Sequence, residues 1–138
     1  MNTPGRMLVI FNHSLTDAQR ADAKAGLGVG EFIAPPANLL ATWGQLPPDT
    51  ATLTQLLAPL FNWLREVGRE GDYVLVQGDF GATHLAVQKA MALGMTPVYS
   101  TTRREAVEVR NGDAISLTHH FRHVRFRLYE ELCQELQP

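Results

Sequence analysis

Two short apolar runs, each followed by a segment with helical periodicity, constrain the fold more than any other feature of the chain. Residues 7–12 (MLVIFN) and 73–77 (YVLVQ) have the composition of strands that are buried on both faces. The segments after them place apolar residues at helical spacing. Strands separated by helices of this length predict right-handed βαβ units and a mainly parallel sheet. We therefore expect an α/β Rossmann-like or flavodoxin-like three-layer sandwich.

Start and stop signals divide the first hundred residues into further elements. Thr16 and Gln19 have the spacing of a capping box, and Gly26 and Gly28 provide a helix end. Pro59 falls inside a longer helical pattern and predicts a kink or two helix segments. The remaining expected elements are a strand at 31–36, helices at 37–43, 50–67 and 82–93, and a strand at 96–100.

The pattern changes after residue 103. Residues 104–121 alternate with a period of two on both sides of Asn111-Gly112, which predicts a C-terminal β-hairpin with a type I′ turn. Residues 123–129 can continue as an extended segment, and residues 130–136 are expected to form a short helix in which Cys133 packs. The sequence contains no repeat, low-complexity segment or linker, so residues 1–138 are expected to form one domain.

Charge and cysteine content narrow the classes of function. The formal net charge is −2, which argues against a duplex DNA-binding protein, but six of the twelve Lys and Arg residues are arginines between positions 103 and 127. This local positive charge fits either a small anionic ligand or a solvated basic hairpin. One cysteine permits no intramolecular disulfide. Because no apolar run is long enough for a signal peptide or a membrane helix, we expect a cytoplasmic protein without membrane contact.

Polar residues follow three of the expected strands. In an open α/β sheet, ligands bind at the carboxyl ends of the strands, where the strand order reverses. This rule nominates three groups of candidate ligand-binding residues on one rim of the sheet: Asn12, His13 and Ser14; Gln77, Gly78, Asp79, Phe80 and Gly81; and Thr101, Thr102, Arg103 and Arg104.

The Gly78–Gly81 turn matches neither a dinucleotide-binding fingerprint nor a P-loop. Its glycines allow a ligand to approach the backbone, and free amides at a helix start favour anions. Asp79 competes with a phosphate, so it is expected to contact a ribose, to pair with an arginine, or simply to cap the helix, with Phe80 in the core. The turn is therefore expected to face a ribose or a base.

The segment from Thr101 to Arg104 offers hydroxyl and guanidinium donors to a phosphate. The alternative is a charged loop in which an arginine pairs with Glu105 or Glu108. His13 can either contact a ligand or cap the adjacent helix. His123 and Arg125 can project from one face of an extended segment toward a ligand or a second subunit.

A metal site in the histidine-rich segment is not expected. His119 and His120 are adjacent, so on a strand they point to opposite faces, and no Asp or Glu lies within the cluster. No cofactor is expected either.

The segments NHSLTDAQ, QGDFGAT, STTRREAVE and FRHVRFRLY, in this order, cover nearly the whole chain. Together they resemble the small CRISPR-associated ring nucleases of type III systems, which belong to the CARF-like (CRISPR-associated Rossmann fold) group. The resemblance implies a homodimer that binds a cyclic oligoadenylate, usually cyclic tetra-adenylate, and linearises it to switch off antiviral signalling. It also implies a metal-independent reaction, in which a 2′-hydroxyl of the ring attacks the adjacent phosphate and leaves a 2′,3′-cyclic phosphate.

Within this scheme the residue roles follow from chemistry. Arg103 and Arg104 are the candidates for stabilising charge on the phosphoryl oxygens, and His13, His123 and Asp79 are the candidates for a general base. Two alternatives remain open. One is a protein that senses or sequesters the same messenger without cleaving it, and the other is an interaction module unrelated to nucleotides.

Overall fold

The computed structural model describes residues 3–132 and has a mixed α/β architecture. Five strands form one sheet in the order β2-β1-β3-β4-β5. Strands β1 to β4 are parallel, whereas β5 runs antiparallel to β4 and forms a C-terminal hairpin with it. The mainly parallel sheet and the hairpin predicted from the sequence are therefore confirmed. The elements are β1 (Gly5–Ile10), α1 (Asp17–Leu27), β2 (Val29–Ile33), α2 (Ala37–Gly44), α3 (Thr54–Val67), β3 (Tyr73–Val76), α4 (Phe80–Ala92), β4 (Thr96–Asn111) and β5 (Ala114–Leu128).

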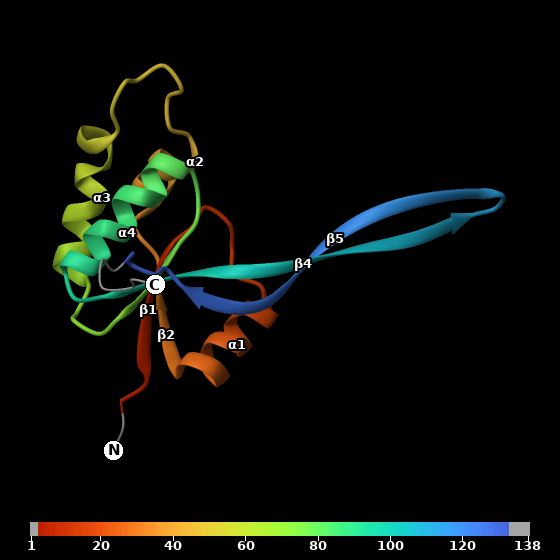
Figure 1. Cartoon of the computed structure of the whole chain (residues 1–138), viewed down its shortest axis with the longest axis horizontal. Helices are drawn as coiled ribbons and strands as arrows, with labels where there is room; N and C mark the ends of the chain where they lie inside the picture. Colours follow the sequence, from red (N-terminus) through yellow and green to blue (C-terminus); the bar gives the residue numbers. More distant parts are fainter. Residues whose placement is uncertain (1–2, 133–138) are drawn as a thin grey trace, which may run out of the picture.

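Helices cover both faces of the parallel strands (Figure 1). Successive side chains of a strand point to opposite faces, so Leu8 and Ile10 of β1 pack with α2, α3 and α4, while Met7 and Val9 pack with α1. The same division holds in β3. The apolar runs seen in the sequence are thus buried on both sides, as parallel strands require.

Helix α3 is one unbroken helix, although Pro59 lies inside it. A proline inside a helix costs about 3 kcal/mol because it removes a backbone hydrogen bond and crowds the preceding turn. Leu57, Leu60 and Leu64 bury one face of α3 in the core. This apolar stripe offsets the penalty, so the prediction of two segments is wrong.

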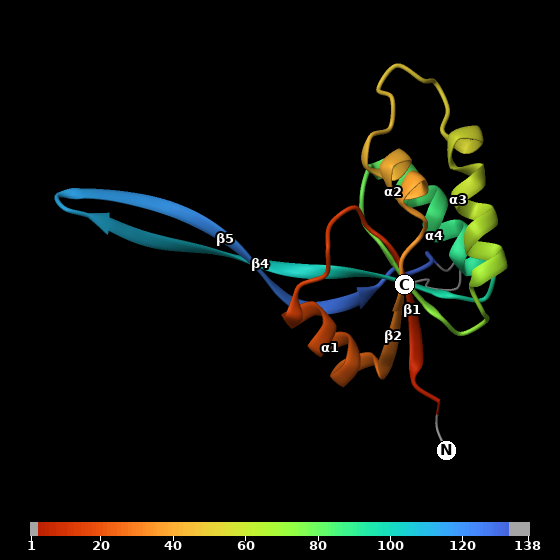
Figure 2. The ribbon, with the colours of Figure 1, turned by 180° about the vertical axis from the view of Figure 1, so that it is seen from behind.

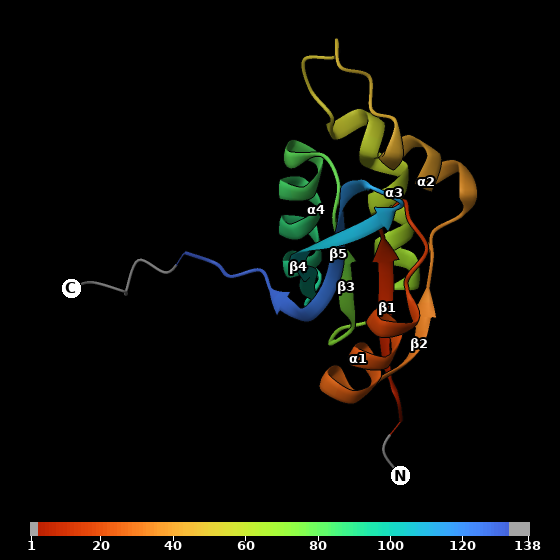
Figure 3. The same cartoon turned by 90° about the vertical axis from the view of Figure 1, so that its right-hand side faces the viewer.

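Strand β4 is much longer than expected and passes through Thr101–Arg104 without a break. These residues are therefore mid-strand, and the prediction of a strand end at residue 100 is wrong. The two strands extend far beyond the body as an arm, which we define as residues 104–121 (Figures 1 and 2). Figure 3 shows the body with helices on both sides of the sheet and the arm pointing toward the viewer.

The hairpin turn differs from the prediction by one residue. Asn111 pairs with Ala114, so the central residues are Gly112 and Asp113. Gly112 has a φ of 66°, while no residue other than glycine in the described chain has a positive φ. A positive φ at the first central position alone fits a type II′ turn rather than a type I′ turn.

The chain after β5 is extended at Tyr129 and has no regular secondary structure through Leu132. The helix predicted for residues 130–136 is therefore absent from 130–132, and its remainder, with Cys133, lies outside the described residues. Within residues 3–132, no helix combines the length and the apolar character needed to cross a membrane.

Candidate functional site at the carboxyl edge of the sheet

Three adjacent hollows line the carboxyl edge of the parallel strands. The β1 hollow, of about 300 Å³, contains Asn12, His13, Ser14 and Arg20 in its wall. The Trp43 hollow, of about 290 Å³, is lined by Asn12, Trp43, Gly44, Gly78 and Asp79, among others. The aromatic pocket, of about 320 Å³, is lined by Gln77, Gly78, Phe80, Thr83, Tyr99 and Tyr129. Since Asn12 belongs to the first two and Gly78 to the last two, the hollows form a continuous row.

The segment after β1 is exposed, as a ligand-binding segment must be. Asn12, His13 and Ser14 are all exposed, and the ring of His13 packs edge-on against Phe11 at a centroid distance of 5.1 Å. The adjacent helix starts with a complete capping box formed by Thr16 and Gln19, so His13 is not its N-cap. Arg20, which the sequence reasoning did not select, brings a guanidinium to this hollow.

The turn after β3 caps helix α4 and packs against Trp43. Asp79 is the N-cap of α4, and its carboxylate accepts a hydrogen bond of 3.0 Å from the amide of Ala82. A β-carbon at Gly78 would lie 2.7 Å from Nε1 of Trp43, so the glycine is required by packing. That Trp43 nitrogen donates a 2.9 Å hydrogen bond to the carbonyl of Gln77 and fixes the turn.

Phe80 does not enter the core. It is 96% exposed at the first position of α4 and contributes to the wall of the aromatic pocket. Gly81 has no close neighbour that would exclude a larger residue, since its nearest non-local atoms are at 3.5 Å or more.

Tyr99 and Tyr129 form the fixed wall of the aromatic pocket. Their ring centroids are 4.8 Å apart, and the hydroxyl of Tyr129 donates to the carbonyl of Val76 at 2.7 Å. Burial, and secondarily the neighbouring Tyr99, raises the pKa of the Tyr129 hydroxyl above its usual value. Arg127 donates to the Tyr99 hydroxyl at 3.0 Å and lies over the same ring. Neither tyrosine was selected from the sequence, because the strand pattern alone did not distinguish them from core residues.

Thr101 is engaged in strand pairing. Its hydroxyl donates to the carbonyl of Arg125 at 3.0 Å and lies 3.2 Å from the amide of the same residue. These contacts close a β-bulge, at which the pairing shifts between Thr101 and Thr102 and one extra residue is accommodated in β5. Thr102 is exposed, and Arg125 also turns its Nε toward the carbonyl of Phe126.

Arg103 and Arg104 are exposed and, within residues 3–132, have no ion-pair partner. They are consecutive residues of a strand and therefore project to opposite faces, so they do not share a site within one chain. Arg103 lies opposite Arg122 in the hairpin register, where like charges repel one another. Arg122 is held by Glu105 at 3.5 Å. Arg103 and Arg122 together give the base of the arm a local positive charge.

His123 is buried and has two hydrogen-bond partners. Its side chain is 5% exposed, with Nδ1 at 2.5 Å from Oγ of Ser100 and Nε2 at 2.7 Å from Oδ2 of Asp22. Gln19 donates to the same Ser100 hydroxyl at 3.4 Å. A neutral imidazole that donates to the carboxylate and accepts from the hydroxyl satisfies all of these groups.

This arrangement contains the three residue types of a hydrolase triad but lacks a substrate path. In such a triad the serine contacts Nε2 and the acid contacts Nδ1, which is the reverse of the order here. Ser100 is buried and lines none of the hollows described above. The network ties the base of the hairpin to α1, and His123 is positioned by it away from solvent.

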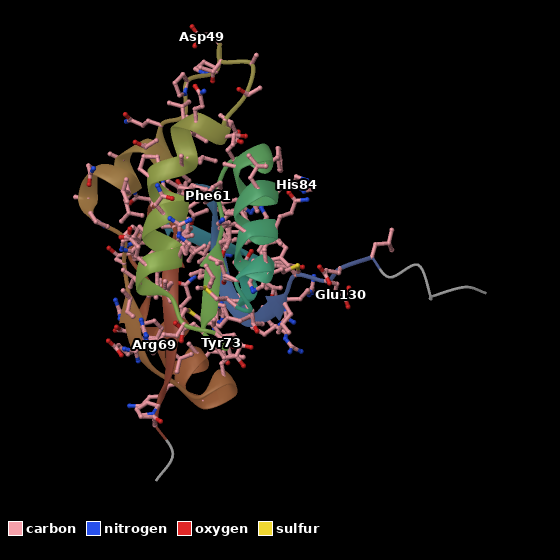
Figure 4. All side chains as sticks on the ribbon, turned by 90° about the vertical axis from the view of Figure 1, so that its left-hand side faces the viewer. Asp49, Phe61, Arg69, Tyr73, His84 and Glu130 are labelled. Carbon is pink, nitrogen blue, oxygen red and sulfur yellow. The ribbon has the colours of Figure 1, made fainter. Side chains whose placement is uncertain are left out.

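A larger hollow, of about 1080 Å³, lies elsewhere. It runs along the outer side of α4, where His84 points outward, and reaches the segment after β5 that contains Glu130 (Figure 4). It touches the row at the carboxyl edge through Phe80 and Thr83. Among residues 3–132, no group of three His, Cys, Asp or Glu side chains is placed so that it could hold a metal ion.

Comparison with known proteins identifies one family. The model of a family described as "Uncharacterized protein MJ1673 family" matches residues 5–127. A protein described as "Uncharacterized protein MJ1673" from Methanocaldococcus jannaschii is 40% identical over 124 residues, which cover 90% of this chain and 96% of that protein. No solved structure was found to match the chain.

Proposed function

The chain belongs to the MJ1673 family, and we propose that it is a ring nuclease that binds and linearises a cyclic oligoadenylate, most simply cyclic tetra-adenylate, in type III CRISPR defence. The observation that carries this proposal is the row of three hollows at the carboxyl edge of the sheet. A cyclic oligonucleotide presents several bases and phosphates around one ring. It therefore requires a set of adjacent subsites rather than one deep pocket.

The strand order supports a flavodoxin-like, CARF-type fold for the body. In the order β2-β1-β3-β4, the strand order reverses between β1 and β3, because successive strands are added on one side of β1 and then on the other. Ligands of such sheets bind at this switch point, beyond the carboxyl ends of the strands. Asn12 follows β1, Gly78 follows β3, and both line the Trp43 hollow.

The chemistry needs no metal or cofactor from the protein. A 2′-hydroxyl of the ring gives its proton to a base and attacks the adjacent phosphate. The bond to the 5′ oxygen breaks, this oxygen takes a proton from water to become a 5′-hydroxyl, and a 2′,3′-cyclic phosphate remains. The protein then contributes mainly by aligning the hydroxyl with the phosphate and by stabilising the developing negative charge. Arg103, beside the positive charge of Arg122, is suited to the second task.

The contacts of the three candidate residues narrow the choice of a general base. Asp79 caps α4, and His123 has partners at both ring nitrogens. His13 is exposed in the β1 hollow. We therefore assign to His13 the role of accepting the proton from the attacking hydroxyl.

A homodimer in the cytoplasm completes the proposal. The arm carries exposed apolar side chains on both faces, chiefly Ile115, Leu117 and Phe121 on β5 and Val107 and Val109 on β4. Isolated two-stranded hairpins are marginally stable, and exposed apolar patches on strand edges commonly mark contact with another chain. A two-fold symmetric dimer would present two equivalent edges to a ring of matching symmetry.

Sequestration of the messenger without cleavage is the second candidate function. It is favoured by the engagement of both His123 and Asp79 in structural hydrogen bonds, which leaves few free catalytic groups at the edge. Binding would use the same row of hollows. The two candidates differ only in whether linear product forms.

Incubation of labelled cyclic tetra-adenylate with the protein in EDTA separates these functions. The proposal predicts multiple turnovers to a linear product that ends in a 2′,3′-cyclic phosphate. Stoichiometric retention of the intact ring would establish sequestration instead. If no cyclic oligoadenylate binds, the protein is an interaction module unrelated to nucleotides.

A matched pair of arginine variants locates the phosphate contacts. Arg103→Ala is expected to lower the single-turnover rate at least about tenfold, the scale of losing one charge-stabilising donor. Arg110→Ala removes the same charge from the exposed part of the arm and serves as the control, with no change expected. Equal rates in both variants and the wild type would contradict the assignment of Arg103.

A further inference from the structure

The aromatic pocket lies beside the Trp43 hollow, and its lining differs from that of the other two. Gln77, Gly78, Phe80, Thr83, Tyr99 and Tyr129 carry no formal charge, whereas Arg20 lines the β1 hollow and Asp79 lines the Trp43 hollow. An uncharged pocket gives a phosphate no counter-charge. A planar, uncharged part of a ligand fits it better.

Aromatic side chains supply flat surfaces to this pocket. Tyr99 and Tyr129 are held in place because the Tyr129 hydroxyl donates to Val76 and the Tyr99 hydroxyl accepts from Arg127. Phe80 is unconstrained by such contacts and is almost fully exposed at the pocket wall. Nucleic-acid bases stack on exposed aromatic rings, and each such contact is worth about 1–3 kcal/mol.

Two polar groups in the pocket have no protein partner among the described residues. Oγ1 of Thr83 is buried without a hydrogen bond. Oε1 of Gln77 accepts a 2.9 Å hydrogen bond from the backbone amide of Ser100, and the side-chain nitrogen of Gln77 remains as a donor. A buried hydroxyl without a partner is costly, so a turn of the Thr83 side chain that brings this hydroxyl to a ligand atom gains binding free energy.

We propose that the aromatic pocket is an adenine-binding site. An adenine offers a flat ring for stacking, ring nitrogens that accept hydrogen bonds, and an exocyclic amine that donates one. The Gln77 amide nitrogen supplies a donor, and the Thr83 hydroxyl supplies a donor and an acceptor. This inference rests on the proposed function and adds to it that base recognition takes place at Phe80, Thr83 and Gln77, while the phosphates lie toward the arginines of the hairpin base.

Adenosine alone tests the pocket, because it carries the base without a phosphate. We expect amide NMR shifts at Gly78, Phe80 and Thr83 during a titration, with a dissociation constant of about 1 mM, as is ordinary for a small fragment. Phe80→Ala and Thr83→Val should each weaken adenosine binding at least about fivefold, which is the lower end of one stacking or polar contact. Phe121→Ala removes an aromatic ring that is 71% exposed on the arm and lies outside the aromatic pocket, so it should leave adenosine binding unchanged.

Phe80 is exposed, so its substitution does not threaten folding and the test stays decisive. Adenosine binding that is unchanged in Phe80→Ala and Thr83→Val, or shifts that map elsewhere, would overturn the adenine site. So would the absence of any adenosine binding at about 10 mM.

The 2′-deoxy analogue of cyclic tetra-adenylate, which lacks the attacking hydroxyl, is titrated in parallel and separates this inference from the proposed function. If both variants bind the ring as tightly as the wild type, the adenine site is wrong and the proposed function stands. If adenosine binds at the pocket but the ring does not bind at all, the adenine site stands and the proposed function is wrong.

Discussion

The body and the arm of this chain follow opposite rules of burial. In the body, alternate residues of β1 and β3 fill two cores, one beneath α1 and one beneath α2, α3 and α4. In the arm, β4 and β5 pair with each other over many residues but cover no core, and large apolar side chains such as Leu117 and Phe121 face solvent. The body buries its large apolar side chains within one chain, whereas the arm leaves large apolar side chains exposed.

Many of the polar and aromatic side chains described above lie at the junction between the body and the arm. The row of hollows ends at the aromatic pocket, which contains Tyr99 of β4 and Tyr129 just beyond β5. Arg103 of β4 and Arg122 of β5 lie opposite each other at the base of the arm. On the other side, Ser100, His123 and Asp22 fasten the hairpin to α1. The proposed ligand site therefore lies where the body meets the extended arm.

The strongest test of this difference in burial shortens one apolar side chain in the body and one on the arm. Leu64→Ala, in the core beneath α3, should lower the free energy of unfolding by about 2–5 kcal/mol because it leaves a cavity. Val109→Ala, on the arm, should change it by less than about 0.5 kcal/mol. Urea denaturation at a concentration where the protein is monomeric measures both. A large cost for Val109→Ala would show that the arm is buried within one chain.

Loss of the hydrogen bonds that connect the base of the hairpin to α1 should have an intermediate effect on the free energy of unfolding. His123→Ala removes the partner of both Ser100 and Asp22, and leaving such groups unpaired costs about 1–3 kcal/mol of unfolding free energy. Asp22→Asn serves as the second variant, and the double variant should cost less than the sum of the two. Strict additivity in urea denaturation would mean that the two side chains do not interact.

Removal of the arm has the smallest expected effect on stability and the clearest effect on assembly. Replacing residues 105–120 by Asn-Gly joins the paired residues Arg104 and Phe121 through a two-residue turn. The free energy of unfolding of the monomer should change by less than about 1 kcal/mol, since surface segments carry little of it. Light scattering should show a dimer for the full chain and a monomer for the shortened one. A dimer that survives the deletion would assign dimerisation to the body.

The same contrast explains what the sequence could and could not predict. Buried parallel strands leave strong signals, so the runs at β1 and β3, the capping box at Thr16 and Gln19, and the nomination of one sheet edge all followed from local pattern. Asp79 as an N-cap was one of the alternatives that the pattern allowed. The continuation of β4 through Thr101–Arg104 was missed because charged residues were interpreted as a loop, although threonine favours strands.

Contacts between distant segments left no comparable signal. Nothing in the local pattern placed Asp22 beside His123, which are 101 residues apart, or Trp43 against the Gln77 carbonyl. The pocket formed by Phe80, Thr83, Tyr99 and Tyr129 depends in the same way on how α4 and the hairpin meet. The sheet edge that carries the row of hollows could be named from the sequence, whereas the side chains that line these hollows together could not.

An equilibrium titration of the 2′-deoxy analogue of cyclic tetra-adenylate, which lacks the attacking hydroxyl and cannot be cleaved, into the protein tests the central claim most directly, with the linear 2′-deoxy tetranucleotide as the control. The account predicts binding of the ring at about 1 μM or tighter, with one ring for two chains and with much weaker binding of the linear form. Absence of binding at about 100 μM, or equal binding of ring and linear oligonucleotides, would contradict it.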